Sequence, residues 1–508
     1  MFRCCAQNWL RSRMWIAALV IGAYLAMAFS FAARKTPWVD EGWIASAPAN
    51  WARTGSFGTP SLQPTGSWLN AELTGIREYT YWNLPVAITA QGLWYKTIGF
   101  SVLKMRALSI LAGMLALVSW FAIVAKLSGN RAAACLTVLI LSFDFTFLWA
   151  AADGRMDMIC AGLGAAGLAS YLIWRERSFY ISLWLANTLL ALSLFTHPNG
   201  ALYVAAFLIL VWMQDRSRLS WRTSPVLTPY LLIAALWAAY ALQRPDYFLA
   251  QMEANSMAIG GTRWAGLAHP LLAIKNEVLI RYLAHFGIYP LWGGEIPSYS
   301  LVIPISYWFL LVAAGVFWYL ERAKGLSVLL CLTAIFVLAM TFLVGLKANA
   351  YLILVLPLYA ASGAVFFCGS HSSRSAFAPV SLFLLTAILV CNVAVIASKL
   401  RHNPFTSEYQ STVEFIRAHL HPGEHVTADS YFGFDLGFER VNDDCRVGYY
   451  SGVRTQLIVE DLWYGVWWRT LFPGEEPELA HYVEQLLKHN YKVIFRSGQF
   501  RVYARRGT

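Results

Sequence analysis

The chain has 508 residues, of which 58% are hydrophobic and only 13% are charged, and its mean hydropathy is +0.50. Soluble globular proteins carry roughly a quarter charged residues, so this composition excludes that class and indicates an integral membrane protein. The formal net charge is +11, but the basic residues lie mainly in short segments between apolar runs. That distribution encodes membrane topology, so we expect no nucleic-acid partner.

Long apolar runs recur from near the N-terminus to residue 398. Most are roughly 18 to 22 residues long, enough for a helix to cross a hydrocarbon core of about 30 Å. The predicted fold is therefore mostly α, a polytopic transmembrane helical bundle. We expect about eleven spans, at 14–33, 107–125, 132–152, 156–174, 179–196, 200–213, 225–242, 300–320, 325–346, 348–369 and 376–398.

Lysines and arginines fall in every second short connection, and such basic loops are retained on the cytoplasmic side. The pattern places the N-terminus inside and the C-terminus outside. We therefore predict a multi-pass protein of the cell inner (plasma) membrane, with its functional loops on the periplasmic or extracellular side. The basic residues that set this orientation are Arg3, Arg11, Arg13, Lys126, Arg131, Arg175, Arg177, Arg216, Arg218, Arg222, Arg322, Lys324 and Arg374.

Two external segments are long and aromatic enough to carry structure of their own. The first, 34–81, is expected to lie at the headgroup level, with a plain aromatic belt as the alternative. It is followed by an apolar stretch too short to span, which we interpret as an interfacial helix with Pro85 in its first turn. The second segment, 243–299, is expected to form helices that lie along the membrane surface.

The composition becomes polar after residue 398, which divides the chain into a transmembrane domain, 1–398, and a small external α/β domain, 399–508. Hydrophobic periodicity predicts helices and strands in the second domain. The helices are expected at 408–420 and 477–489, and the strands at 425–429, 491–496 and 499–504.

Acidic side chains at the membrane edge are the first candidates for function, because burying a charge there is costly. Asp40 and Glu41 follow the first span directly, and Asp157 opens the fourth. The alternative for the Asp40–Glu41 pair is a solvated interfacial position. The alternative for Asp157 is a local ion pair in which Arg155 binds either Asp157 or Asp153.

Basic side chains on the same side are the second group of candidates. His197 lies in a tight turn, where it is either a proton carrier, a donor to phosphate or incidental. Lys347 stands at the mouth of a span, where it either contacts phosphate or extends to the interface. Arg263 and Arg281 meet an anionic headgroup or face water. The cysteine and histidine spacings match no metal site, so no cofactor is indicated, and a divalent ion is left open.

The order and sidedness of several short motifs are informative together. They resemble the C-type (GT-C fold) membrane glycosyltransferases, in the branch of the protein O-mannosyltransferases and lipid A aminoarabinose transferases. The resemblance covers spans one to ten. The motifs are Asp40-Glu41 after the first span, Gly99-Phe100-Ser101 and Arg106 before the second, Arg155-Met156-Asp157 after the third, and Lys347-x-x-x-Tyr351 with Pro357 in a late span.

The resemblance implies a polyprenyl-phosphate-sugar-dependent glycosyltransferase, a hexosyl- or pentosyltransferase acting at the outer face of the membrane. The sugar would pass to a lipid, glycan or protein acceptor with inversion at the anomeric carbon, and 34–106 would be the catalytic external loop. The resemblance implies three groups of site residues. The catalytic residues would be Asp40, as general base, with Glu41 and Asp157. The donor phosphate would be bound by Lys347, Tyr351, Arg155, His197, Arg263 and Arg281, and the acceptor site or cavity would be lined by Trp43, Tyr81, Trp82 and Asn83.

The chain departs from the aminoarabinose transferases at two positions. They carry an arginine where this chain has Trp43, and a lysine before Pro-Pro-Leu where it has Asn83-Leu84-Pro85-Val86. Both departures remove charge that would bind phosphate, so His197, Arg263, Lys275 or Arg281 is expected to supply it. A multispan transporter or lipid flippase is the alternative function, although the internal repeats typical of transporters are not evident.

Overall fold

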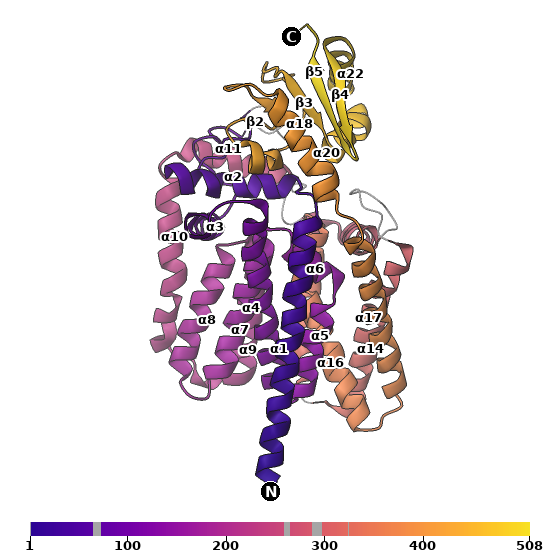
Figure 1. Ribbon diagram of the computed structural model, residues 1–508. Helices are drawn as coiled ribbons and strands as arrows, with labels where there is room; N and C mark the ends of the chain where they lie inside the picture. Colours follow the sequence, from indigo (N-terminus) through magenta and orange to yellow (C-terminus); the bar gives the residue numbers. More distant parts are fainter. Residues whose placement is uncertain (1, 65–72, 259–264, 287–296, 324, 508) are drawn as a thin grey trace.

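The computed structural model describes residues 2–64, 73–258, 265–286, 297–323 and 325–507. The chain forms a mostly helical bundle with a small β-sheet at one end (Figure 1). The N-terminus lies at the opposite end of the bundle from the C-terminus.

Each predicted apolar run coincides with a helix, because a long run of apolar side chains can satisfy its backbone only within itself when water is absent. The run at 132–152 contains two helices, α5 and α6. The elements are α1 (Phe2–Arg34), α4 (Val102–Ser128), α5 (Arg131–Ser142), α6 (Phe145–Ala151), α7 (Met156–Trp174), α8 (Phe179–Leu194), α9 (Ala201–Asp215), α10 (Thr228–Ala241), α14 (Val302–Glu321), α15 (Leu326–Phe342), α16 (Leu356–Ser372) and α17 (Ala378–Leu400).

The protein is a multi-pass membrane protein. Six helices in the described part of the chain are long and apolar enough to cross a membrane, and α5 with α6 makes a seventh if the bent pair is one span. α8 and α15 are apolar but shorter. The count of eleven and the in–out orientation stay predictions.

The bend of 66° between α5 and α6 is the main departure from the predicted straight spans. Asp144 lies at this break, where its carboxylate accepts the Phe147 N–H (3.0 Å) and the Tyr307 hydroxyl (3.0 Å). The Asn392 side chain accepts the Phe145 N–H (2.7 Å). Side chains thus satisfy backbone groups that the broken helix leaves unpaired inside the bundle.

The run predicted at 348–369 is also interrupted. It begins with a 3₁₀ turn, η6 (Asn349–Leu354), before α16 starts, with Pro357 in the first turn of α16. Proline is favoured there because its missing N–H has no partner in a first turn. The tighter turn holds Tyr351 buried beside the loop that contains His197.

The segments predicted to be external form short helices at the end of the bundle that carries the sheet, and α2 and α11 lie across that end (Figure 1). Pro85 is the first residue of α3, as predicted. The elements are α2 (Val39–Thr54), α3 (Pro85–Ile98), α11 (Pro245–Ala258), α12 (Ala265–Ala268), α13 (Pro270–Asn276) and η4 (Glu277–Ala284). Short turns η1 (Pro198–Gly200), η2 (Arg216–Arg218), η3 (Trp221–Leu227) and η5 (Ser298–Leu301) complete the connections.

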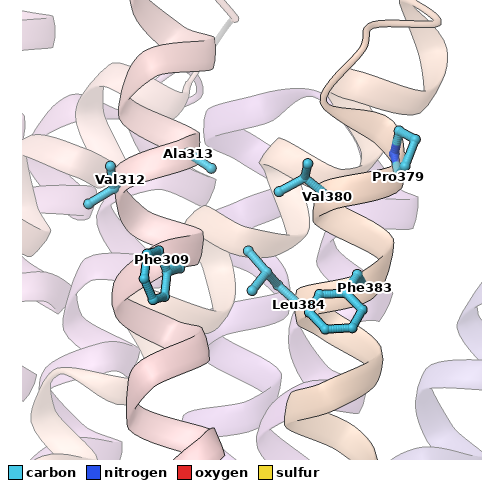
Figure 2. Close-up of a pocket in the computed structure, with 7 residues that line it drawn as sticks. All are labelled: Phe309, Val312, Ala313, Pro379, Val380, Phe383 and Leu384. Carbon is cyan, nitrogen blue, oxygen red and sulfur yellow. The ribbon is translucent and has the colours of Figure 1, made fainter.

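An apolar groove of about 440 Å³ lies between α14 and α17. Figure 2 shows Val380 and Leu384 of α17 directed toward α14. Its lining is suited to hydrocarbon and holds no titratable group: Phe309, Val312, Ala313, Pro379, Val380, Phe383 and Leu384.

The C-terminal α/β unit, residues 405–505, contains a five-stranded mixed sheet with strand order β2-β1-β3-β5-β4. β1 is parallel to both β2 and β3, and the other pairs are antiparallel. The strands are β1 (Val426–Thr427), β2 (Val441–Asn442), β3 (Leu457–Glu460), β4 (Tyr491–Ser497) and β5 (Phe500–Arg505). The helical elements are η7 (Phe405–Gln410), α18 (Ser411–His419), η8 (Ser430–Phe432), α19 (Gly433–Leu436), α20 (Leu462–Val466), η9 (Trp467–Leu471), α21 (Phe472–Glu475) and α22 (Pro477–Asn490).

Most predicted elements of this unit are present, including α18, α22 and the β4–β5 pair. The sequence analysis did not predict β2 or β3, which are two and four residues long and fully buried. A buried strand this short has no alternation of polar and apolar residues to reveal it.

Three carboxylates are buried where this unit meets the first external loop. Asp443 accepts the Ser430 N–H (2.9 Å), and Asp461 accepts the Tyr431 hydroxyl (2.5 Å). Burial raises the pKa of Asp443 to about 6 and also raises that of Asp461. Burial raises the pKa of Asp429 well above its usual value, and the charges of the other two raise it further.

We predict that this unit loses stability as the pH rises above about 4. Because the pKa of Asp429 is raised, the folded state binds more protons than the unfolded chain at such pH values, so the free energy of unfolding falls as the pH increases. The Asp429→Asn variant lacks this titration. The melting temperature of this variant in detergent, minus that of the unsubstituted protein, should increase as the pH is raised from about 4. A constant difference over this range would contradict the prediction.

Candidate active site

The first turn of α2 carries the adjacent acids Asp40 and Glu41, and their side chains have different surroundings. The Glu41 side chain is fully buried and binds Arg106 through both oxygens, at 2.7 and 2.6 Å. It also accepts the Trp38 N–H (3.2 Å), which closes the start of the helix. Glu41 was predicted to be catalytic beside Asp40, and the structure places its carboxylate in a buried ion pair.

Arg106 connects three parts of the chain at this corner. Besides Glu41, its guanidinium donates to the carbonyls of Ala32 (2.6 Å), Lys35 (2.8 Å) and Thr36 (3.2 Å). These carbonyls belong to the end of α1 and to the residues that follow it. A single buried side chain on α4 therefore fixes how α1 turns into α2.

Asp40 is the partly exposed member of the site, with 27% of its side chain accessible. It forms an ion pair with Arg155, and Arg155 also binds Asp157 (Nε to Oδ2, 2.6 Å). The local Arg155–Asp157 pair expected as an alternative is therefore present. The same guanidinium also reaches Asp40, which lies 115 residues earlier.

Asp157 has a second neighbour in His197. The His197 Nδ1 accepts the Asn199 N–H (3.1 Å), which leaves the proton of a neutral ring on Nε2. Burial lowers the pKa of His197 and favours this neutral form. Its Nε2 lies 3.6 Å from the Asp157 Oδ1, which is buried and has no hydrogen-bond partner in the described residues. The buried Asp157 Oδ1 therefore faces the N–H of the neutral His197 ring.

Gly154 allows the chain to present Arg155 and Asp157 together. Its φ is +63°, a left-handed conformation that favours glycine, and a Cβ there would crowd Met105 and Glu41. Its carbonyl accepts a hydrogen bond from Gln91 of α3 (3.1 Å). The turn into α7 is thus held by α3.

A second charged cluster contains the predicted phosphate-binding residues Lys347 and Arg281. Both bind Glu277, at 3.1 Å and 2.9 Å, and both donate to the Met340 carbonyl at the end of α15. Tyr351 lies between the two clusters, with its ring centroid 5.3 Å from that of His197 and 5.8 Å from the Arg281 guanidinium carbon. Tyr351 and His197 therefore connect Arg281 to Asp157 through a chain of side-chain contacts.

The chain was compared with proteins of known family and structure. No family model matches it, and no curated protein matches it. Solved structures do match: ArnT from Cupriavidus metallidurans bound to undecaprenyl phosphate is 14% identical, with a TM-score of 0.56 over 99% of each chain. The archaeal oligosaccharyltransferase AglB from Archaeoglobus fulgidus, in complex with an inhibitory peptide and a dolichol-phosphate, is 13% identical, with a TM-score of 0.52 over 94% of this chain and 69% of that one.

The chain has the GT-C fold. This confirms the fold-level resemblance expected from the motifs. At these identities the similarity does not transfer residue roles, so the roles of Asp40 and its neighbours stay predictions.

The four residues predicted to line the acceptor site or cavity have different surroundings in the structure. Trp43 is buried, and its indole N–H donates to Asp443 of the C-terminal unit (2.6 Å). Tyr81 is buried in an aromatic cluster, with its ring centroid 4.9 Å from that of Tyr240. Trp82 packs against Trp43, at 5.8 Å between ring centroids. The next residue, Asn83, is buried.

Two charged side chains that were not among the predicted site residues complete these clusters. Lys35 pairs with Asp153 and lies over the Trp149 ring, 4.1 Å from its centroid. Glu277 joins the two cationic candidates, and its spacing of four residues from Arg281 on one helix was the available signal. Arg263, a predicted phosphate ligand, lies outside the described residues.

No group of three or more histidine, cysteine or acidic side chains in the described parts of the chain is arranged to hold a metal ion. The side chains brought together here are carboxylates, cations and one neutral imidazole. Such a set is suited to binding an anionic phosphate and accepting a proton.

We predict that Glu41 and Asp40 differ in their effect on stability. The Glu41→Gln variant leaves the buried Arg106 charge uncompensated and should lower the free energy of unfolding by roughly 3–5 kcal/mol. The Asp40→Asn variant should cost less than about 1 kcal/mol, because Asp40 is partly exposed and Arg155 keeps Asp157 as a partner. Thermal unfolding in the same detergent measures both, and equal losses would contradict the distinction.

Proposed function

We propose that the protein is a glycosyltransferase that moves a sugar from a polyprenyl-phosphate donor to a lipid, glycan or protein acceptor. The reaction would occur at the outer face of the membrane. Asp40 would act as the general base, and the anomeric centre would be inverted. The bound undecaprenyl phosphate and dolichol-phosphate of the two structural neighbours support a lipid-phosphate donor.

The observation that carries this proposal is the difference in exposure among the clustered acids. Glu41 and Asp157 are almost wholly buried, whereas 27% of the Asp40 side chain is accessible. A general base must reach the proton that it removes, so it must contact the acceptor. Of these three carboxylates, Asp40 meets that requirement.

The proposed chemistry is a single displacement. The acceptor hydroxyl oxygen forms a bond with the anomeric carbon while its proton passes to the Asp40 carboxylate. The bond between the anomeric carbon and the phosphate oxygen breaks, and its electron pair leaves with the lipid phosphate. Attack from the face opposite to the phosphate inverts the anomeric carbon.

Arg155 would couple donor binding to this step. Its guanidinium is shared between Asp40 and Asp157. The donor phosphate can bind the Arg155 guanidinium through two oxygens. The ion pair between Arg155 and Asp40 would therefore weaken as the donor binds. Asp40 is then a stronger base when the donor is present.

The donor phosphate would bind four side chains: His197, Tyr351, Lys347 and Arg281. The neutral His197 ring can donate from Nε2, and the cations stabilise the charge that grows on the leaving phosphate. Asp157 would hold the Arg155 guanidinium and the His197 ring in place. These assignments give each side chain one role that its contacts allow.

We predict that Asp40→Asn lowers kcat by about 100- to 10,000-fold, the range that general-base catalysis supplies. The substitution keeps the shape of the side chain and removes its ability to take a proton. Sugar transfer from a polyprenyl-phosphate donor is measured with purified protein in vesicles. Donor binding should persist, because Arg155 and the other phosphate-binding residues are unchanged.

The matched control is Arg53→Gln at the far end of α2, where the side chain is exposed and bound to Glu439 at the surface (2.8 Å). This variant should retain the transfer rate of the unsubstituted protein. Full activity of Asp40→Asn would remove Asp40 from the mechanism. Lipid movement without consumption of the sugar would instead indicate the flippase alternative.

We also predict the stereochemistry of the product. A single displacement requires the anomeric configuration of the product to be opposite to that of the donor. The one-bond carbon–hydrogen coupling at the anomeric carbon, measured by NMR on both molecules, distinguishes the two configurations. A product with the donor configuration would indicate a double displacement and would rule out the proposed mechanism.

A further inference from the structure

The helix that carries Asp40 is pressed directly against the C-terminal unit. A Cβ added to Gly42 would overlap the backbone of Ser430 and Tyr431 in η8. Glycine is therefore required at this position for the backbone of α2 to approach so closely. The contact lies two residues after Asp40.

A buried hydrogen bond continues this interface at the next residue. The Trp43 indole N–H donates to the Asp443 Oδ2 (2.6 Å), across 400 residues of sequence. The same oxygen accepts the Ser430 N–H (2.9 Å) and hydroxyl (2.7 Å), and the other oxygen accepts the Tyr464 hydroxyl (2.9 Å). One carboxylate thus holds α2, η8 and α20 together.

The loop after α2 is tied to the same place. The Asp443 N–H donates to the Ser61 carbonyl (2.9 Å), and Leu62 forms a parallel bridge with Asp443. A line of hydroxyls runs from Ser430 to Ser61 (2.9 Å) and from Ser61 to Ser46 of α2 (3.1 Å). The first external loop is therefore added to the edge of the C-terminal sheet.

We propose that the C-terminal unit positions the catalytic base: Ser430, Tyr431 and Asp443 are positioning residues that set where α2 lies and so hold the Asp40 carboxylate against Arg155. This inference rests on the proposed function, because it assigns Asp40 the role of base. Glu41 and Arg106 hold the first turn of α2 from the bundle side. The contacts at Gly42 and Trp43 hold it from the other side, and the two sets together fix the helix.

The physical reason is the sensitivity of proton transfer to geometry. A displacement of about 1 Å in a catalytic group can cost on the order of 100-fold in rate. Because α2 is one rigid helix, a shift at Gly42 moves Asp40 as well. The C-terminal unit then affects the rate without touching the reacting atoms.

The test uses two variants at the interface in the full-length protein. Gly42→Ala forces α2 away from η8, and Trp43→Phe removes the buried hydrogen bond while keeping an aromatic ring. We expect kcat to fall on the order of 100-fold for Gly42→Ala, and by less for Trp43→Phe, with the KM for the donor unchanged. Amide hydrogen exchange of residues 39–54 should increase in both variants.

The matched control is Glu439→Gln. It breaks the Arg53–Glu439 ion pair, which also joins α2 to the C-terminal unit but is exposed on both sides. An exposed pair contributes little, so both kcat and exchange should be unchanged. If Gly42→Ala does not fold, Trp43→Phe still decides the question.

If the unsubstituted protein transfers sugar and the interface variants have the same kcat despite faster amide exchange in α2, the positioning role is wrong and the proposed function is unaffected. Unchanged exchange in both interface variants would show that the C-terminal unit does not hold α2. An unsubstituted protein that transfers no sugar would instead remove the proposed function, and the positioning role with it. The three results are therefore distinguishable.

Discussion

Charged side chains buried at the edge of an apolar bundle lose their hydration, and each is stable only beside a partner of opposite sign. In this protein three of the pairs join segments that are far apart in sequence: Glu41 with Arg106, Asp40 with Arg155, and Glu277 with Lys347. Because an unpaired member would be costly, these pairs determine how the helix ends meet. The geometry around Asp40 depends on this requirement.

Within that arrangement, the adjacent acids Asp40 and Glu41 have different contacts. Glu41 is surrounded by donors and fixes the corner between α1 and α2, whereas Asp40 shares one guanidinium with Asp157 and remains partly exposed. A shared, partly solvated ion pair is held less firmly than a buried bidentate one. Asp40 is therefore able to exchange its partner, which a catalytic group in contact with substrate must do.

The C-terminal unit supplies a second constraint from the opposite side of α2. The contacts of Gly42 and Trp43 with η8 and Asp443 are buried, and they involve the residues that directly follow the acid pair. A loop anchored on one side only would leave the helix able to rotate. Contacts on two sides of α2 fix its position, and an active site needs its side chains held in a fixed geometry.

The sequence by itself determined the membrane class, the positions of the long helices, the helix that begins at Pro85, and most of the helices and the final hairpin of the C-terminal unit. These features depend on composition and local periodicity, which a single segment carries. The candidate acids Asp40, Glu41 and Asp157 were also visible, because charges at the edge of apolar runs are rare. Only the tertiary structure decided that Arg155 joins Asp40 to Asp157, that Lys347 and Arg281 share Glu277, and that Trp43 binds a carboxylate 400 residues away. Arg155 and Asp40, Lys347 and Glu277, and Trp43 and Asp443 come from segments far apart in the sequence, so no local pattern records these partners.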